Sequence, residues 1–377
     1  MKILHVVTLI SPDGAYGGPV RVAVNQAREL VDLGHDVTIA AGTRGFDVPP
    51  THQDGVPLQL FPVRAILPGS GFAGLSSPAM LSWFLRHARD YDVVHVHLAR
   101  DLVTMPMARL AQARGLPVFA QTHGMIDPTD KALATPLDAA FTRPILRKAA
   151  SVFHLTEHEK SDVQAVCGDG IRFAQLANGV PVAEHSAERD AGVPSVLFLA
   201  RLQQRKRPTD FVDAAIAVLA AGIDARFTLI GPDEGEADAV TRRIQQSEAA
   251  ASIEWKGALS PDRTLDAMRS ADLYVLPSVD EPYPMSVLEA MSVGLPVIVT
   301  DTCGLAPMVS SNDCGSVTDG TVESLTAAMT RLLNDPLMLR ETGQNAAETV
   351  RRTAGMAAVA QTLQAAYSGA VTPSSAP

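Results

Sequence analysis

The chain has 377 residues, 46% of them hydrophobic and 19% charged, which is the composition of a globular protein long enough for two domains. Its formal net charge of −10 argues against general nucleic-acid binding, and no apolar run reaches the roughly 18 residues of a membrane span. Three cysteines, Cys167, Cys303 and Cys314, are too few for a disulfide framework or a zinc site, so we expect free thiols. The N-terminus lacks a signal-peptide layout and predicts a cytoplasmic protein.

Residues 2–10 form an apolar, β-rich run that we expect to be a buried strand. A glycine-bearing loop at residues 11–18 follows, and then a helix that opens at Pro19 and runs to about residue 33. Gly17 and Gly18 let the backbone approach a ligand at a strand-to-helix junction, where an anion is favoured. An ordinary tight turn is the alternative. The G-x-G-x-x-G fingerprint of dinucleotide enzymes is absent, so an NAD enzyme fits poorly.

Two histidines alternate along the strand predicted at residues 92–98, which follows a strand at 37–41 and an irregular, Pro- and Gly-rich stretch at 42–80. We expect His95 to be buried and hydrogen-bonded. His97 is a candidate on the acceptor side, because ligands of parallel sheets bind beyond the carboxyl ends of the strands, and a buried histidine is its alternative reading.

The next strand, at residues 117–121, ends in Thr122-His123-Gly124, and His123 is therefore well placed to meet a ligand. Its alternative role is to stabilise the turn. Asp127 and Lys131 are weaker acceptor-side candidates in the same loop.

A basic edge lies on the helix predicted at residues 136–148, where Arg143, Arg147 and Lys148 share one side. This is a solvated face or a contact for membrane phosphates. A strand at 151–155 then leads to a helix at 157–165, which a capping box of Thr156 and Glu159 opens, and to a strand at 173–176.

A second series of strands and helices follows the polar stretch after residue 181. Nearly continuous apolar strands that alternate with helices indicate doubly wound parallel sheets, so we predict an α/β protein with two Rossmann-like domains and a ligand cleft between them. The strands are expected near 194–199, 226–230, 252–255, 272–276 and 296–300, and the helices near 207–221, 236–249, 260–270, 284–293, 321–334, 336–350 and 354–368. The predicted boundaries are residues 1–181, a linker at 182–193, a second domain at 194–352, and a C-terminal helix at 353–377 that crosses back to the first domain and ends in a disordered tail.

The second domain opens with basic residues at a strand-to-helix junction. Arg201 ends the first strand and Lys206 precedes a helix, so both can bind phosphate, Arg201 bidentately and Lys206 as a point charge. A solvent-facing cluster is the alternative, and Arg205 and Arg207 are expected to be exposed.

Residues 275–300 read as strand, loop, helix and strand, with Glu281 in the loop, Glu289 on the helix and seven residues between them. Pro284 suits the first helical turn, and the backbone N–H groups that follow it, at Met285, Ser286 and Val287, would face an anion. An anion between two hydroxyl-binding carboxylates suits a nucleotide sugar. Two solvated surface acids are the alternative.

This segment resembles the E-x7-E region of retaining glycosyltransferases with the GT-B fold, in family 4. The matching residues are Pro277, Ser278, Glu281, Glu289, Ala290, Gly294, Pro296 and Val297. The resemblance extends over nearly the whole chain, through Y-G-G-P at 16–19, H-V-H at 95–97, T-H-G at 122–124, N-G-V at 178–180 and A-R-L at 200–202. One departure is Pro282, which replaces the usual glycine, removes a backbone N–H and restricts Glu281.

The resemblance implies roles for the candidate residues. Arg201, Lys206, Gly17 and Gly18 would bind the donor diphosphate, Glu289 the ribose, and Glu281 and His123 the donor sugar near the reacting carbon. No clear D-x-D metal motif is present, so no metal or cofactor is expected, and the nucleotide sugar, a UDP- or GDP-sugar, is a co-substrate.

The resemblance also implies a glycan or lipid-linked glycan acceptor in exopolysaccharide, capsule or lipopolysaccharide synthesis, with peripheral contact to the inner membrane face. Retention would follow from same-face substitution or from double displacement through Glu281. A nucleotide-sugar epimerase and a non-catalytic sugar-nucleotide binder on the same fold are the alternatives.

Overall fold

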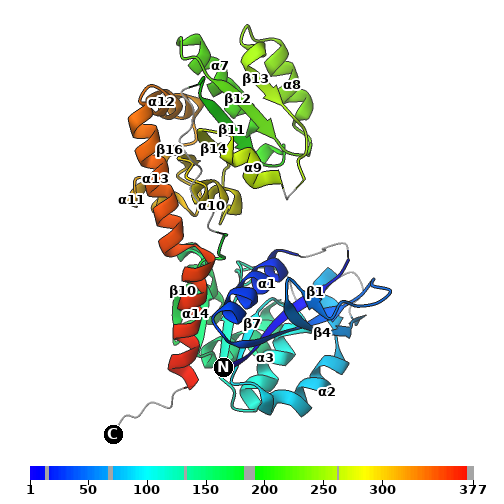
Figure 1. Cartoon of the computed structure of the whole chain (residues 1–377). Coiled ribbons are helices and arrows are strands. Elements are labelled where there is room, and N and C mark those ends of the chain that lie inside the picture. Colours follow the sequence, from blue (N-terminus) through cyan, green and yellow to red (C-terminus); the bar gives the residue numbers. More distant parts are fainter. Residues whose placement is uncertain (13–16, 67–70, 131–133, 182–191, 261–262, 372–377) are drawn as a thin grey trace. The chain divides into compact units, whose positions relative to one another are not determined.

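The computed structural model describes residues 1–12, 17–66, 71–130, 134–181, 192–260 and 263–371. The chain divides into two compact units (Figure 1). Unit 1 contains Met1–Gly179 together with the C-terminal Met356–Pro377, and unit 2 contains Val180–Gly355. Residues 182–191 of the predicted linker and the predicted disordered tail after residue 371 lie outside the described residues.

Unit 1 is built on an eight-stranded sheet in the order β10-β9-β8-β7-β1-β2-β4-β3. Its neighbours are parallel except β3 and β4, which pair antiparallel. The order reverses at β1, because β2 and β4 lie on one side of it and β7 to β10 on the other. The loops after β1 and β7 therefore diverge, and ligands of open parallel sheets bind at such a switch point.

The strands of unit 1 are nearly continuous apolar runs, because helices cover both faces of the sheet. They are β1 Lys2–Ile10, β2 Asp36–Thr43, β3 His52–Gln53, β4 Val56–Pro62, β7 Val93–His97, β8 Val118–Gln121, β9 Ser151–His154 and β10 Phe173–Gln175, with a separate antiparallel pair of β5 Arg64–Ala65 and β6 Leu75–Ser76.

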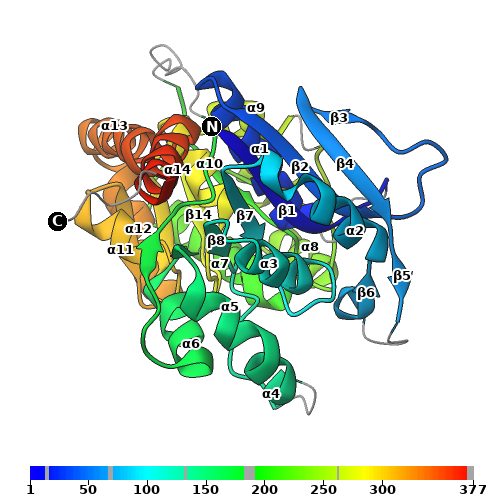
Figure 2. The same cartoon turned by 90° about the horizontal axis from the view of Figure 1, so that it is seen from below.

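Two hydrophobic clusters hold the helices on the sheet. One contains residues of α2, α3, α5 and α6, and the other contains residues of α1 and α14, so these two sets cover opposite faces (Figure 2). The helices are α1 Gly17–Asp32, α2 Pro78–His87, α3 Thr104–Ala113, α4 Ala134–Leu137, a π-helical turn η3 Asp138–Thr142, α5 Arg143–Lys148, α6 Glu157–Cys167 and α14 Met356–Val371, with 3-10 turns η1 Gly71–Gly74 and η2 Ala88–Asp90.

The prediction of an irregular stretch at residues 42–80 is wrong in part. It contains β4, which alternates Val56 and Leu58 toward the core and pairs with β2 in parallel register. Its prolines, Pro57 and Pro62, occupy positions near the two ends of the strand, where a missing N–H interrupts few sheet hydrogen bonds. The high proline content therefore concealed a strand near the edge of the sheet.

Unit 2 has a six-stranded parallel sheet in the order β13-β12-β11-β14-β15-β16, the order of a Rossmann fold, with its switch point between β11 and β14. Its strands are β11 Ser195–Leu199, β12 Arg226–Ile230, β13 Ile253–Trp255, β14 Leu273–Leu276, β15 Val297–Thr300 and β16 Gly315–Thr318. Its helices are α7 Pro208–Ala220, α8 Ala237–Gln245, α9 Thr264–Arg269, α10 Met285–Ser292, α11 Ala306–Ser311, α12 Val322–Leu333 and α13 Pro336–Thr353, with 3-10 turns η4 Gln204–Lys206 and η5 Ala250–Ser252.

The predicted elements of unit 2 are present, and β16 and the short α11 were not predicted. The strand β16 is short and polar at alternate positions, so its sequence carries no apolar run. None of the described helices in either unit is long and apolar enough to cross a membrane.

Candidate active site

An ion pair lies at the switch point of unit 2. Lys206 ends the turn η4 after β11, and Glu281 lies in the loop after β14. Lys206 Nζ pairs with Glu281 Oε2, and each residue is only 9% exposed. Arg205 Nη2 lies 3.6 Å from the same carboxylate oxygen. One buried carboxylate thus faces two cations, which neutralise its charge.

Backbone contacts fix the two loops that carry this pair. Val279 N donates to the carbonyl of Arg205 at 3.0 Å, and Arg205 Nη1 donates to the carbonyl of Asp280 at 3.0 Å. The carbonyl of Glu281 in turn accepts from Gly304 N at 2.8 Å. Asp280 adopts a left-handed φ of 49°, which a non-glycine residue rarely does. The loop before Glu281 is therefore held in a defined, strained conformation.

Arg201 lies at the same edge and forms an exposed ion pair. Its Nη1 is 2.9 and 3.1 Å from the two carboxylate oxygens of Glu234, and the two side chains are 53% and 37% exposed. An exposed pair of this kind contributes about 0–1 kcal/mol, so a phosphate oxygen can replace Glu234 at low cost.

The N-terminus of α10 faces the same edge of the sheet. Pro284 is its N-cap residue, in extended conformation, and not a first-turn residue as predicted. Met285 and Ser286 open the helix, so their N–H groups have no intrahelical acceptor. Val287 N donates to the carbonyl of Pro284 at 3.1 Å, which makes it a weaker anion ligand than predicted.

Tyr274 of β14 connects the residues of this site. Its hydroxyl oxygen lies 2.8 Å from Ser286 Oγ and 3.0 Å from the carbonyl oxygen of Leu199. Burial raises the pKa of Tyr274, and the carboxylates of Glu289 and Glu281 raise it further. Tyr274 is therefore neutral, and the carboxylates of both glutamates of the E-x7-E segment influence the pKa of this one buried side chain.

The one cysteine beside this site is not a nucleophile. Cys303 is 4% exposed, and its burial, with the nearby Glu281 carboxylate, raises the pKa of the thiol to about 11. All three cysteines are buried and unpaired.

In unit 1, a clamped turn carries His123. Its φ is 50°, in the left-handed region. The buried Glu159 carboxylate accepts from Thr122 Oγ1 and Gly124 N, both at 2.6 Å, on the two sides of the histidine. Its other oxygen accepts from Leu155 N at 2.7 Å. The single carboxylate of Glu159 therefore fixes this turn and holds His123 in a strained backbone conformation.

These contacts correct the predicted capping box. Thr156 Oγ1 accepts from Glu159 N at 3.1 Å, as predicted. The carboxylate of Glu159 binds Leu155 N and the turn after β8, and not the backbone N–H of Thr156. A glutamate that the sequence places in a helix cap thus belongs to the site.

Behind His123 lies a chain of buried histidines. His97 Nδ1 is 2.8 Å from His123 Nε2, and His97 Nε2 is 3.2 Å from His5 Nδ1. His95 Nδ1 lies 2.5 Å from the hydroxyl of Tyr367 on α14, so the prediction of a buried, hydrogen-bonded His95 is confirmed. Burial lowers the pKa of His123 to about 4 and that of His5 to about 3. These rings are neutral at pH 7.

His97 is 1% exposed. Burial also lowers its pKa well below the usual value. The structure therefore places His97 in the interior behind His123. This agrees with the alternative reading of His97 as a buried histidine and not with a position on the acceptor side.

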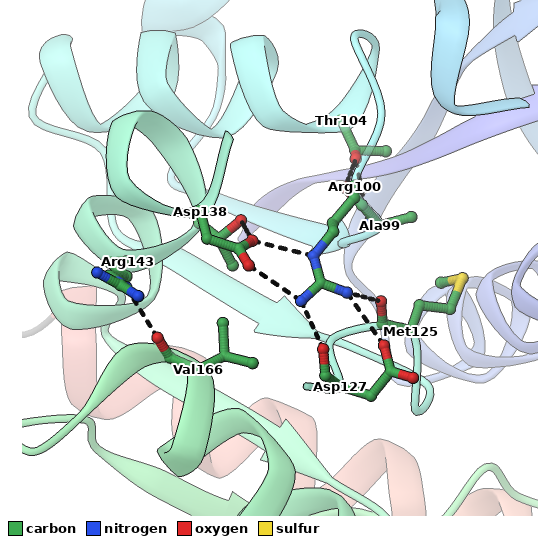
Figure 3. A network of polar contacts seen from close by, with 9 residues as sticks. Ala99, Arg100, Thr104, Met125, Asp127, Asp138, Arg143 and Val166 are labelled. Carbon is green, nitrogen blue, oxygen red and sulfur yellow. Dashed lines mark hydrogen bonds and ion pairs between the residues drawn. The ribbon is translucent and has the colours of Figure 1, made fainter. Parts of the chain in front are cut away.

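Asp127 is held by a residue that the sequence did not single out, Arg100 in the loop after β7 (Figure 3). Arg100 Nη1 lies 3.0 Å from Asp127 Oδ1, and Nη2 donates to the carbonyl of Asp127 at 2.7 Å. On its other side, Arg100 Nε and Nη2 donate to the buried carboxylate of Asp138 at 2.9 and 3.1 Å. Arg100 therefore ties the loop after His123 to the π-helical turn.

Gly17 and Gly18 form the first turn of α1 and not a loop before it, so the helix begins two residues earlier than predicted. A Cβ added at Gly18 would meet no atom within 4 Å, so packing within the chain does not demand glycine there. Lys131 lies outside the described residues.

The basic edge of α5 is partly used within unit 1. Arg143 Nε donates to the carbonyl of Val166 at 2.8 Å, and Arg147 donates through Nε and Nη2 to the carbonyl of Cys167 at 3.0 and 2.6 Å. These carbonyls end α6, where cations are favoured. Two of the three cations of the predicted basic edge, which was read as a solvated face or a contact for membrane phosphates, therefore cap the C-terminus of α6.

The residues of these sites that the sequence did not single out include His5, Arg100, Asn178, Arg205 and Tyr274. Asn178 stands in the N-G-V motif and Arg205 in the basic run, so both carried a local signal. His5 and Arg100 carried none, since their partners lie on other strands and loops.

Comparisons with known proteins agree with this architecture. The family described as "Glycosyl transferases group 1" matches residues 183–349, and that described as "Glycosyl transferase 4-like domain" matches residues 17–179. D-inositol 3-phosphate glycosyltransferase 2 of Catenulispora acidiphila is 26% identical over 95% of this chain and 92% of its own length. Phosphatidyl-myo-inositol mannosyltransferase of Mycolicibacterium smegmatis is 24% identical over 89% and 86%.

Solved structures of the same fold cover nearly the whole chain. HepE of Anabaena in complex with UDP superposes with a TM-score of 0.73 at 15% identity over 98% of this chain and 100% of its own. The lipopolysaccharide outer core galactosyltransferase WaaB superposes with a TM-score of 0.68 at 15% identity over 98% and 99%.

Proposed function

Because this chain belongs to the group 1 glycosyltransferases, retaining enzymes of family 4 with the GT-B fold, we propose that it transfers a hexose from a UDP-sugar to a glycan or lipid-linked glycan acceptor. The predicted family, fold and enzyme class are confirmed by the matches to both halves of the chain. The nucleotide, the sugar acceptor and the residue roles below are the proposal.

The observation that carries the proposal is the Lys206–Glu281 pair at the switch point of unit 2. Two cations, Lys206 and Arg205, converge on one buried carboxylate, and Arg201 lies at the same edge in an ion pair that is easily exchanged. A diphosphate can replace Glu234 on Arg201 and contact the N–H groups at the start of α10, beside Lys206 and Arg205, which stay on Glu281. Positive charge and a helix dipole at this place stabilise a leaving nucleoside diphosphate without a metal ion.

Glu289 is assigned to the ribose hydroxyls. Glu289 is the fifth residue of α10 and is half-buried. At this position its carboxylate can accept hydrogen bonds from two hydroxyls of a bound nucleoside. In unit 1, His123 is assigned to hydroxyls of the donor sugar, and Asp127, held by Arg100, to the acceptor. Gly17 and Gly18 are assigned to the donor through their backbone N–H groups at the start of α1.

The ion pair also bears on how the configuration is retained. A double displacement needs a free carboxylate nucleophile beneath the anomeric carbon. Glu281 Oε2 is bonded to Lys206 and lies beside Arg205, which lowers its nucleophilicity. We therefore favour same-face substitution, in which the C–O bond to the diphosphate breaks, the acceptor oxygen bonds to the anomeric carbon on the same face, and the acceptor proton passes to the departing phosphate oxygen.

The choice of a UDP-sugar is supported by the neighbours of known structure. HepE was solved with UDP and with UDP-glucose, and the structures superpose with TM-scores of 0.73 and 0.69. The relatives named above act, by their names, on inositol-containing acceptors, and WaaB on lipopolysaccharide. Polyhydroxylated acceptors are common to all of them, which supports a glycan acceptor and a role in polysaccharide or lipopolysaccharide synthesis beside the inner membrane face.

The test is a transfer assay with the full chain. Thermal-shift screening against UDP-, GDP- and ADP-sugars first selects the donor, and the selected donor is then incubated with an extract of membrane-bound and free glycans. A glycosylated acceptor with retained anomeric configuration is the expected product. A free epimer of the donor would favour an epimerase, and binding without any product would favour a non-catalytic binder.

A covalent adduct separates the two retaining routes. Under same-face substitution, mass spectrometry of the protein incubated with a 2-fluoro donor analogue shows no sugar on Glu281. A trapped glycosyl ester on that residue would overturn the same-face route while leaving the transferase function in place.

A further inference from the structure

Two hydrogen-bonded chains of buried polar groups lie behind His123. The first contains the imidazoles of His5, His97 and His123, with nitrogen distances of 3.2 and 2.8 Å. Burial lowers the pKa of His123, and a side-chain hydrogen bond with Asn178 raises it. His97 occupies Nε2 of His123, so Nδ1 is the ring nitrogen that can face a ligand.

We propose that His5 and His97 are positioning residues that fix His123 in the neutral tautomer with its proton on Nδ1, so that His123 meets a substrate oxygen as a hydrogen-bond donor. The contact with substrate rests on the function proposed above. The tautomer does not, because it follows from the hydrogen bonds within unit 1.

The direction of the chain follows from which buried atom is left without a partner. A neutral imidazole has one N–H and one bare nitrogen, so two bonds in series run the same way. If each Nε2 donated, the proton of His5 would sit on Nε2, a buried atom with no partner among the described residues. An unpaired buried N–H is rarer than an unpaired acceptor. Each Nδ1 therefore donates, from His5 through His97 to His123.

A second chain, made of amides, lies beside the histidines. Gln26 Nε2 donates to Gln121 Oε1 at 3.1 Å, and Gln121 Nε2 donates to Asn178 Oδ1 at 3.3 Å. The buried atom left without a described partner is again an acceptor, Gln26 Oε1. The amide chain thus follows the same rule as the histidine chain, in which an unpaired acceptor and not an unpaired N–H ends the series.

The surroundings keep the chain neutral. His5 and His97 pack against His95, with distances between ring centroids of 4.7 Å from His5 to His95 and 4.8 Å from His97 to His95. Tyr367 of α14 packs against His95 and is hydrogen-bonded to it. Burial lowers the pKa of each of these histidines. The carboxylate that binds this turn, Glu159, accepts from Thr122 Oγ1 and Gly124 N. No described acid therefore bonds the rings and favours an imidazolium.

The same cluster raises the question of a metal ion, because ligand nitrogens of His5, His95 and His97 lie within 4.8 Å of one another. The rings of His95 and His97 are parallel, at 1° and 4.8 Å, so their faces meet and their in-plane lone pairs do not converge. Both nitrogens of His97 are already hydrogen-bonded. The geometry therefore favours the hydrogen-bonded chain.

A donor at His123 has a chemical consequence. The Nδ1–H of His123 can donate to a hydroxyl or phosphate oxygen of the ligand, but a protonated Nδ1 cannot take up a further proton from one. His123 would then orient the sugar and not serve as a general base. This agrees with same-face substitution, in which the leaving diphosphate accepts the proton.

The tautomer is measured on the full chain by ¹⁵N NMR with ¹⁵N-histidine, where bare and protonated ring nitrogens resonate apart. We expect His5, His97 and His123 to carry protons on Nδ1, each assigned by the loss of its signals in a single variant. A protonated Nε2 on His123 in the unmodified protein would overturn the proposal. So would a zinc ion that co-purifies in equal amount and is lost in His5→Asn.

The positioning role is tested with two nearly isosteric variants, His97→Asn and His97→Leu. Asparagine keeps an N–H at the place of Nδ1, so His123 should keep its tautomer and transfer should stay within about threefold. Leucine removes it, so both tautomers of His123 should appear and kcat/KM should fall about tenfold, the equivalent of about 1.4 kcal/mol for one hydrogen bond.

The outcomes separate the inference from the proposed function. If no nucleotide sugar supports transfer in any form of the protein, the function fails while the tautomer assignment stands. If His97→Leu mixes the tautomers but transfers at the normal rate, the positioning role is overturned. Should His97→Leu not fold, His5→Leu against His5→Asn repeats the comparison one ring further from the ligand, with the same expected mixing in the leucine variant only.

Discussion

At the switch point of unit 2, cations are paired with carboxylates around a buried ion pair, whereas at that of unit 1 His123 is backed by neutral rings. In unit 2, Lys206, Arg205 and Arg201 each lie beside a carboxylate. In unit 1, His123 is backed by imidazoles that burial keeps uncharged, while the charged Arg100, Asp127 and Asp138 bind one another in neighbouring loops. Two sheets of the same kind thus place ion pairs in one case and neutral rings in the other at equivalent positions.

The difference matches the two kinds of oxygen in a nucleotide sugar. Cations suit a diphosphate, whose charge compensates for the exchange of ion-pair partners. Neutral, fixed donors and acceptors suit sugar hydroxyls, which carry no charge and are recognised by the direction of their hydrogen bonds. In unit 1 buried groups fix the direction of the hydrogen bonds, and in unit 2 the loops at the carboxyl edge of the sheet gather positive charge.

Of the changes considered, Lys206→Ala in the charged site of unit 2 should have the largest effect on transfer. It removes the cation that we assign to the leaving diphosphate, so kcat/KM should fall about 10²–10³-fold, the effect of losing one transition-state charge contact. Steady-state transfer with the selected UDP-sugar measures it. Arg269→Ala, which removes another cation of unit 2 from an exposed pair with Asp266, is the matched control and should transfer normally. Near-normal turnover of Lys206→Ala would refute the site assignment.

Lowering the pH should destabilise unit 1, whose buried histidines are neutral. The pKa of His5 is about 3 in the folded protein against 6.5 for the exposed ring, so the unfolded chain binds more protons between these values. The free energy of unfolding then falls as pH drops below about 6.5, by about 2 kcal/mol between pH 7 and pH 5 for His5 alone. Urea unfolding at the two pH values measures it.

Fluorescence makes this measurement specific for unit 1. The chain has two tryptophans, so in a Trp255→Phe background the signal comes from Trp83 on α2. His5→Asn removes one titrating ring and should reduce the loss of stability on acidification. An equal loss in the presence and absence of His5 would show that its pKa is not depressed.

Glu159→Gln should loosen the turn that carries His123. The amide keeps one acceptor oxygen where the carboxylate served three donors, Thr122, Gly124 and Leu155, so at least one of them loses its partner. We expect unit 1 to lose about 1–2 kcal/mol and the KM for the donor to rise. Glu157→Gln on the same helix, with its side chain 74% exposed, is the control and should change neither. Unchanged stability in Glu159→Gln would contradict the clamp.

Tyr367→Phe should have the smallest effect. It removes the hydroxyl that bonds His95 and leaves the packing of α14 on the sheet unchanged. The expected cost is about 1 kcal/mol of unit 1 stability, seen by Trp83 fluorescence, with normal transfer. A loss of transfer without a loss of stability would mean that this contact acts on the site directly.

Local patterns in the sequence carried most of the fold. The segment β14–α10–β15 is marked by short apolar runs, by Pro284 before the helix and by Gly294 after it, and all three elements form where predicted. Strands buried on both faces leave such runs because both of their faces pack against apolar side chains of the covering helices. Where that signal fails, as in the proline-bearing β4 and the polar β16, the strand was missed.

The residue types of the candidate site could also be predicted, since phosphate binding needs cations and a helix start, and a short local motif marks each of them. The partners of these residues could not be predicted from the sequence. Lys206 and Glu281 are 75 positions apart in the chain. His5 and His97 are 92 positions apart and meet because β1 and β7 are neighbours in the sheet, with His5 directly opposite His95.

The sequence by itself therefore determined the family, the two parallel-sheet units and the chemical types of residue at each carboxyl edge, because these depend on local runs and short motifs. Only the tertiary structure decided which charges pair, that His97 supports His123 from behind, and that Glu159 belongs to the His123 turn. The physical reason is that hydrogen-bond direction and burial depend on strand register and loop contacts between residues far apart in the chain, which no local pattern encodes.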